Sequence, residues 1–231
     1  MTVGRIALVL GATILTVLLA LALWPDEPLD AATAAALRVP ERLPARSNGY
    51  NALVGFPVAT QHDSVAAGFA AVSRLNTLFA TDVAPITRAA IDNAWIQPEF
   101  DPASIKPYVC DFSGPECAAK IRQHGAQLAA ESAFADVYVE RILALADFPH
   151  YRTELEAHLA APFPALGSVA GAYRLALARR IVGSSASRSA LITNELRVAR
   201  TLLARADSLI VKMIALKMTM LALHALSALQ C

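Results

Sequence analysis

Residues 187–206 read SRSALITNELRVARTLLARA. At about 100° per residue, the apolar side chains of this stretch share an arc of about 160°, and the polar ones lie opposite. The apolar set is Leu191, Ile192, Leu196, Val198, Ala199, Leu202 and Leu203; the polar set is Thr193, Asn194, Arg197, Arg200 and Arg205. The stretch therefore predicts an amphipathic α-helix that packs one side against a core.

A second helix is predicted just before it, at residues 168–181, and Gly183 is typical of a helix end. Joined by a short Gly-Ser turn, the two helices resemble the helical hairpins of tetratricopeptide-type repeats, although no second copy recurs at a fixed period. The chain is rich in alanine, with only 6% aromatic residues. These features predict an all-α fold, a bundle of several helices.

Apolar spacing predicts further helices at residues 63–79, 118–146 and 208–230. Another is expected to begin at Pro149, because proline is favoured in a first helical turn, and to end before Pro162. Residues 50–57 are interpreted as a short strand or a buried extended segment. The Pro-rich front segment at residues 81–115 is expected to consist mainly of loops, with a short helix near residues 86–95.

The N-terminus contains an uncharged run at residues 6–24, close to the roughly 20 residues that cross a bilayer as a helix. Arg5 precedes the run and acidic residues follow it, which places the rest of the chain outside the cytoplasm. We therefore expect a single transmembrane anchor (1–24), a tether (25–48) and a helical domain (49–231). The alternative is a cleaved signal peptide, since residues 20–22 read Ala-Leu-Ala.

Arginine outnumbers lysine by 16 to 4, which, with the alanine excess, indicates a GC-rich bacterial genome and hence a Gram-negative periplasm. Charge is distributed unevenly: residues 25–117 contain 11 acidic and 6 basic side chains, whereas residues 166–217 contain 2 acidic and 9 basic. Either the two parts pack together, or the basic part binds an acidic protein or anionic lipid headgroups. Nucleic acid is not an expected partner of an exported domain. The candidate partner surface comprises Arg174, Arg179, Arg180, Arg197 and Arg200.

The cysteines Cys110 and Cys117 flank a turn-forming Ser-Gly-Pro-Glu segment. In an oxidising compartment two thiols at this spacing predict a disulfide. Zinc would require further ligands, and a redox pair is usually Cys-x-x-Cys. Cys231 remains as an odd thiol.

Glu195 falls inside the apolar arc of its helix. A buried carboxylate is costly unless it is paired, so an ion pair is expected, with Arg188 as the first candidate and Arg174 and Lys212 as alternatives. A general acid or base with a raised pKa is the other interpretation of Glu195.

His150, Glu154 and His158 would form a stripe on the helix that begins at Pro149. The two histidines would lie about 12 Å apart along the axis, so one metal ion does not reach both. We expect a solvated polar stripe rather than a metal site, and no cofactor. Sequence motifs of serine nucleophiles and phosphate-binding loops are absent, so an enzyme is not indicated.

The last segment, residues 208–230, is the most apolar part of the chain after the anchor. A core helix is favoured over a membrane-lying or membrane-spanning one, because Lys212, Lys217 and His224 interrupt it.

Three segments resemble a group of uncharacterised periplasmic proteins of Gram-negative bacteria: Asn51-Ala-Leu-Val-Gly-Phe, Cys110-Asp-Phe through Cys117, and Leu209-Ile-Val-Lys-Met213. The resemblance implies no activity. The predicted function is protein–protein interaction, as an envelope adaptor, a secretion accessory or an immunity-type protein. The alternatives are a helical envelope hydrolase and a lipid-binding protein.

Overall fold

A computed structural model describes residues 42–80, 86–107, 109–110, 112, 114–155, 160–183 and 188–230. Contacts divide the chain into two units, Met1–Pro40 and Glu41–Cys231. The expected anchor at residues 6–24 and most of the tether lie outside the described residues. All the described helices belong to the second unit.

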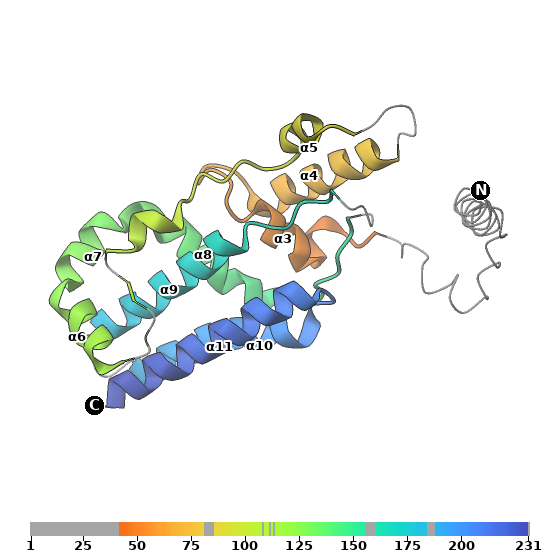
Figure 1. The fold of residues 1–231 in the computed structure, drawn as a ribbon. Helices are drawn as coiled ribbons and strands as arrows, with labels where there is room; N and C mark the ends of the chain where they lie inside the picture. Colours follow the sequence, from red (N-terminus) through yellow and green to blue (C-terminus); the bar gives the residue numbers. More distant parts are fainter. Residues whose placement is uncertain are drawn as a thin grey trace, which may run out of the picture. The chain divides into compact units, whose positions relative to one another are not determined.

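Helices account for all the regular secondary structure of the described residues, which confirms the predicted all-α class (Figure 1). The α-helices are α3 (Gly49–Gly55), α4 (Ser64–Phe79), α5 (Arg88–Ala94), α6 (Pro115–Gln123), α7 (Gly125–Glu131), α8 (Asp136–Ala144), α9 (Leu166–Val182), α10 (Arg188–Arg205) and α11 (Leu209–Gln230). Short 3-10 turns occur at η1 (Ala45–Ser47), η2 (Pro102–Ile105), η3 (Ala133–Ala135) and η4 (Leu145–Asp147).

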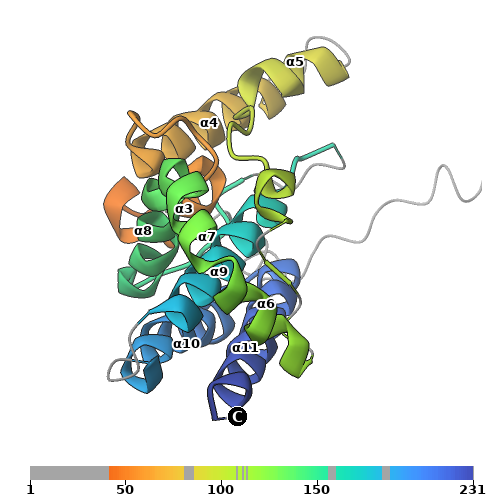
Figure 2. The ribbon, with the colours of Figure 1, turned by 90° about the vertical axis from the view of Figure 1, so that its left-hand side faces the viewer.

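Helix α9 lies at the centre of the core, in contact with α6, α7, α8, α10 and α11 (Figure 2). Its sequence is apolar around most of its circumference, as expected of a helix with neighbours on several sides. The buried apolar side chains of α9 are Val169, Ala172, Tyr173, Leu175, Ala176, Leu177, Ala178 and Ile181. Small residues among them allow the surrounding helices to approach closely.

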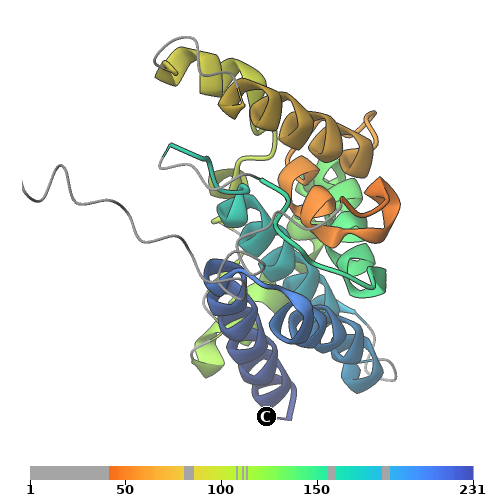
Figure 3. The same cartoon turned by 90° about the vertical axis from the view of Figure 1, so that its right-hand side faces the viewer.

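The predicted hairpin is present as α9 and α10, and α11 continues from it to lie beside α10 (Figure 3). Ile192, Val198, Ala199 and Leu202 of the predicted apolar arc are buried, which confirms the amphipathic interpretation of α10. Leu203, at the edge of that arc, is 38% exposed.

Residues 49–55 form a helix, so the prediction of an extended segment there is wrong. The side chain of Asn48 caps α3 by accepting a hydrogen bond from the Tyr50 N–H, and all residues of α3 are buried. Helix α4 crosses α3 at very short range: a Cβ on Gly68 would lie 1.9 Å from the Asn51 carbonyl oxygen, and one on Gly55 1.7 Å from that of Ser64. Only glycine fits at this crossing.

The single helix predicted at residues 118–146 is divided into α6, α7 and α8, so that prediction is also wrong. The breaks fall at His124 (φ −98°, ψ 14°) and Ser132 (φ −100°, ψ 7°). The Ser132 hydroxyl donates a hydrogen bond to the Leu128 carbonyl, a local bond that competes with helix continuation. The breaks let the chain bend around α9, while Leu128 and Ile142 remain buried.

No helix begins at Pro149 among the described residues. Instead, the backbone from His150 to Thr153 is held by groups distant in sequence. Asn48 donates to the Arg152 carbonyl (2.8 Å) and accepts from the Arg152 N–H (3.0 Å). Gly49 N–H donates to the His150 carbonyl (2.7 Å), and the Asp207 carboxylate accepts from both the N–H and the hydroxyl of Thr153. These long-range bonds replace those that a helix would supply.

The predicted disulfide is confirmed: Cys110 and Cys117 are bonded, with their Cα atoms 5.9 Å apart. The bridge closes a short loop onto the first turn of α6. Within this loop Phe112 is buried and has a left-handed backbone (φ 56°). The loop therefore inserts an aromatic ring into the core and ties the Pro-rich segment to α6.

Candidate functional site

The outer face of α11 exposes large apolar side chains. Of the ten large hydrophobic residues exposed in the described part of the chain, six belong to this helix. Five of them form one stripe, which we call the α11 seam: Leu209 (72% exposed), Met213 (63%), Leu216 (53%), Met220 (47%) and Leu223 (53%). Monomeric proteins rarely expose contiguous apolar surface of this kind unless it binds something.

The opposite face of α11 packs on α9 and α10. Its buried side chains are Val211, Ala215, Met218, Leu221, Ala222 and Ala225. The predicted core helix is thus present, but only one of its faces belongs to the core. By length and composition alone, Leu209–Ser227 is also a candidate membrane span within the described residues.

Successive residues of the α11 seam are spaced alternately by four and three positions. That spacing averages 3.5 residues and is the apolar pattern of a helix that pairs with another helix. Lys212 and Lys217 lie on the two margins of the seam, and His224 lies on the same margin as Lys217. No aspartate or glutamate occurs in residues 208–230, so the seam has basic margins only.

Sequence reasoning missed the α11 seam, although its spacing can be read from the sequence. Both faces of α11 are apolar, so periodicity did not distinguish the face that is buried from the face that is exposed. The three-dimensional packing of α9 and α10 against one face makes that distinction.

The five arginines of the predicted partner surface do not form one face. Arg179 binds the Asp136 carboxylate and the Ser132 carbonyl, and Arg180 binds Glu195. Arg174 is partly buried on α9. Arg179 and Arg180 therefore make contacts within the domain.

Arg197 and Arg200 instead lie on the outer face of α10. Arg197 is 3.1 Å from the Asp147 carboxylate, but both groups are more than half exposed. A surface hollow of about 540 Å³ adjoins this face, lined by Thr193, Leu196, Arg197, Arg200, Thr201, Ala204 and Arg205. This part of the predicted surface is exposed.

The ion pair expected at Glu195 is present, with Arg180 as its partner. The Arg180 Nε donates to Glu195 Oε1 at 3.0 Å, and the Glu195 side chain is completely buried. The first expected partner, Arg188, has its side chain outside the described part of the structure, and Arg180 was not among the predicted partners. The Tyr173 hydroxyl donates to the Glu195 carbonyl, and burial together with the Glu195 charge raises the pKa of that hydroxyl. The pair joins α9 to α10 inside the core.

His150 and Glu154 of the predicted stripe do not lie on a helix. His150 is exposed, whereas Glu154 is buried, accepts a hydrogen bond from the Leu43 N–H (2.8 Å) and lies 3.8 Å from Arg152. His158 lies outside the described residues. Within the described ranges, no cluster of three or more histidine, cysteine or acidic side chains is arranged to hold a metal ion.

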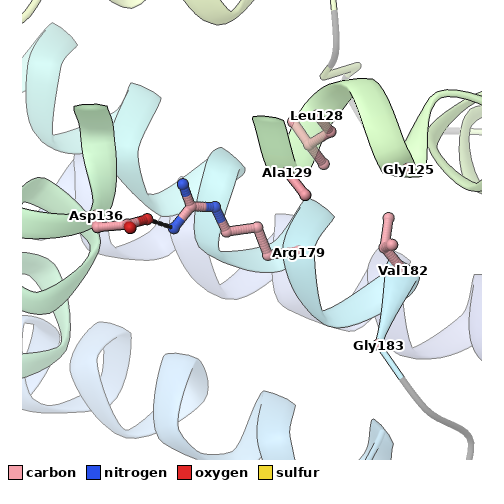
Figure 4. A pocket seen from close by; sticks show the side chains of 7 residues that line it. All are labelled: Gly125, Leu128, Ala129, Asp136, Arg179, Val182 and Gly183. Carbon is pink, nitrogen blue, oxygen red and sulfur yellow. Dashed lines mark hydrogen bonds and ion pairs between the residues drawn. The ribbon is translucent and has the colours of Figure 1, made fainter. Parts of the chain in front are cut away.

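A small hollow of about 320 Å³ lies between α7 and the end of α9 (Figure 4). Arg179 and Asp136 form one wall and bind each other, and the remaining lining is apolar, from Leu128, Ala129 and Val182. Since the two charged groups satisfy each other, the hollow presents no bare charge to a ligand.

The groups with shifted pKa values have structural roles. Burial raises the pKa of the Tyr50 and Tyr151 hydroxyls well above the ordinary range. The charges of Asp207 and Glu154 raise the pKa of Tyr50 further, whereas the charge of Arg205 opposes the effect of burial on the pKa of Tyr151. Burial lowers the pKa of the Arg141 guanidinium, which donates hydrogen bonds to the carbonyls of Phe56, Val58, Ala59 and His62. Arg141 thus holds the loop between α3 and α4.

No protein-family model matches the chain, and neither a curated protein nor a solved structure is similar to it. In the described part of the chain, the α11 seam and the outer arginines of α10 are exposed.

Proposed function

We propose that the helical domain is a protein-binding module of the bacterial envelope that contacts its partner through the α11 seam. The observation that carries this proposal is the row of five exposed leucine and methionine side chains on one face of α11. Each of them is between 47% and 72% exposed, and covering apolar surface is worth about 25 cal/mol per Å². A protein partner gains this free energy by covering the seam.

In the same proposal, the exposed Arg197 and Arg200 on α10 attract a partner with acidic residues. The segment 166–217 has a balance of +7, from 9 basic and 2 acidic residues, and these two arginines contribute from the exposed face of their helix. Exposed charges of one sign accelerate association with a partner of opposite sign more than they add affinity. We assign them to steering an acidic partner toward the domain.

The location belongs to the same proposal. An anchor at residues 6–24 would hold the domain on the periplasmic side of the inner membrane, and a cleaved signal peptide would release it there. Either arrangement suits an envelope adaptor, a secretion accessory or an immunity-type protein, all of which act by binding another protein.

Site-specific photo-crosslinking in native envelopes tests the proposal. A photoreactive residue at Met213 or Met220 should yield a discrete protein adduct, and the same residue at the exposed Lys106 serves as the matched control. Leu216→Glu should abolish the adduct at Met213 while the Cys110–Cys117 disulfide and the helical circular-dichroism spectrum are retained. Adducts that are equal at Lys106 and Met213, or the absence of any protein adduct at the seam, would refute protein binding by α11.

A further inference from the structure

We infer that the occupant of the α11 seam is an amphipathic helix with acidic residues beside its own apolar stripe, paired with α11 as in a two-stranded coiled coil; this rests on the proposed protein-binding function. Three observations carry the inference: the period of the seam, the basic residues on its margins and the residue types that it lacks.

The period indicates a helix as the occupant. In a heptad labelled a to g, Met213 and Met220 take position a, and Leu209, Leu216 and Leu223 take position d. The seam spans about 21 Å at about 1.5 Å per residue, which is two heptads or about four helical turns. Methionine at both a positions adapts to varied side chains, as on other surfaces that bind helices.

The margins indicate the charge of that helix. In the same heptad Lys212 falls at position g, and Lys217 and His224 fall at position e. Residues at e and g face the partner's own e and g positions and determine which partner is accepted. With no carboxylate in residues 208–230, α11 leaves these lysines to be paired by glutamate or aspartate from the partner.

A second copy of the chain is disfavoured as the occupant, because its α11 has the same basic residues on its margins. Parallel pairing of two α11 helices would place Lys212 of one copy opposite Lys217 of the other, and like charges across such a seam are unfavourable. The chain's own segment at residues 6–24 contains no charged residue and supplies no carboxylate either. Neither occupant neutralises the lysines.

A lipid surface is disfavoured as the occupant by the amino-acid composition of α11. Residues 208–230 contain no phenylalanine, tryptophan or tyrosine, although helices that lie in a membrane interface commonly use aromatic side chains there. The five residues of the seam also fall within an arc of about 80°, which is the narrow stripe of a coiled-coil contact. A helix of protein is therefore favoured over lipid.

The test uses the full chain reconstituted in nanodiscs of phosphatidylethanolamine and phosphatidylglycerol. Two synthetic three-heptad peptides serve as probes, both with isoleucine at a and leucine at d, one with glutamate and the other with lysine at e and g. Like charges at e and g discourage each peptide from pairing with itself. Binding is measured by fluorescence anisotropy at low and high salt.

The glutamate peptide should bind about tenfold more tightly than the lysine peptide, and salt should reduce the difference. The double variant Lys212→Glu/Lys217→Glu should reverse the preference, which shows that the margins select the partner. Leu216→Glu should weaken binding of both peptides because it interrupts the apolar seam. Equal binding of the two peptides, or no binding of either, would overturn the inference.

A photoreactive residue placed at Met220 of the chain in these nanodiscs shows which molecule or segment covers the seam. Label transfer to the glutamate peptide supports the inference, whereas transfer to lipid, to a second copy or to residues 6–24 of the same chain in the presence of that peptide overturns it. The proposed function is judged separately: a seam-dependent protein adduct in native envelopes, without binding of the glutamate peptide, would retain protein binding and reject the acidic helix.

Discussion

The Nε of Arg180 lies 3.0 Å from Oε1 of Glu195 and donates a hydrogen bond to it, although no part of the Glu195 side chain is exposed. The pair crosses from α9 to α10, the two helices of the central hairpin. Its position inside the core makes its removal costly. The effect of this removal on stability distinguishes a structural role of Glu195 from a role as a general acid or base.

Replacing Arg180 by methionine should reduce the free energy of unfolding by about 3 kcal/mol, because it leaves a buried carboxylate unpaired. The double variant Arg180→Met/Glu195→Leu should recover much of that loss, since neither charge then remains in the core. Urea denaturation of the two variants and the parent measures both effects. A Glu195→Gln variant that keeps full stability would contradict the structural role and favour a general acid or base.

Gly68→Ala should destabilise the protein, because a Cβ at this position would lie 1.9 Å from the Asn51 carbonyl oxygen. Forcing α3 and α4 apart is expected to cost about 1–3 kcal/mol or more. Gly167→Ala in the first turn of α9 is the matched control, since its Cβ would meet no atom within 4 Å. Thermal denaturation should show a lower Tm for Gly68→Ala and an unchanged or higher Tm for Gly167→Ala. Similar values for both would contradict the close crossing.

Arg141→Ala should cost about 2–4 kcal/mol of stability, because four backbone carbonyls of the loop after α3 lose a charged donor. The carbonyls belong to Phe56, Val58, Ala59 and His62. By comparison, Arg88→Ala removes only an exposed ion pair with Asp92 within α5, which is worth about 0.5 kcal/mol. Faster hydrogen exchange across residues 56–62 in Arg141→Ala, but not in Arg88→Ala, would locate the effect. Equal stability of the two variants would contradict it.

Stability should decrease in acid partly through Asp63, the cap of α4. The Ala66 N–H, followed by the Val65 N–H and the charge of Arg46, holds the pKa of this carboxyl below its ordinary value, against a smaller opposing effect of burial. A lowered folded pKa means that the charged form stabilises the protein above the unfolded pKa of about 3.9, and that this contribution disappears as pH falls through the folded value.

Asp63→Asn tests this dependence, because asparagine also caps helices but does not titrate. The stability difference between the parent and Asp63→Asn should favour the parent near neutral pH and should shrink below about pH 4. Urea denaturation at several pH values measures it. A difference independent of pH would show that the Asp63 charge is not involved.

The disulfide predicts a thiol count of one under denaturing, non-reducing conditions, since the chain has three cysteines and two are bonded. Replacing both Cys110 and Cys117 by serine should reduce stability by about 2–3 kcal/mol through the larger entropy of the unfolded chain. Three free thiols in protein isolated from cells would contradict both the disulfide and an oxidising location.

Predictions from sequence succeeded where the controlling interactions are local. The helix at α10 follows from apolar spacing, and the bond between Cys110 and Cys117 follows from a short turn between two thiols. Predictions failed where partners distant in sequence decide the backbone. Asn48 and Asp207 hold residues 150–153 in an irregular conformation, and nothing in the local sequence around Pro149 indicates that they do.

By itself, the sequence determined the helical class, the disulfide and the need for a cation beside Glu195, because periodicity, loop closure and the cost of a buried charge act on residue types and short spacings. Only the tertiary structure decided that Arg180 supplies the cation and that α3 and α4 cross at glycines. It also decided which of the two apolar faces of α11 is buried. That choice depends on how α9 and α10 pack, and it leaves the side chains of the α11 seam exposed.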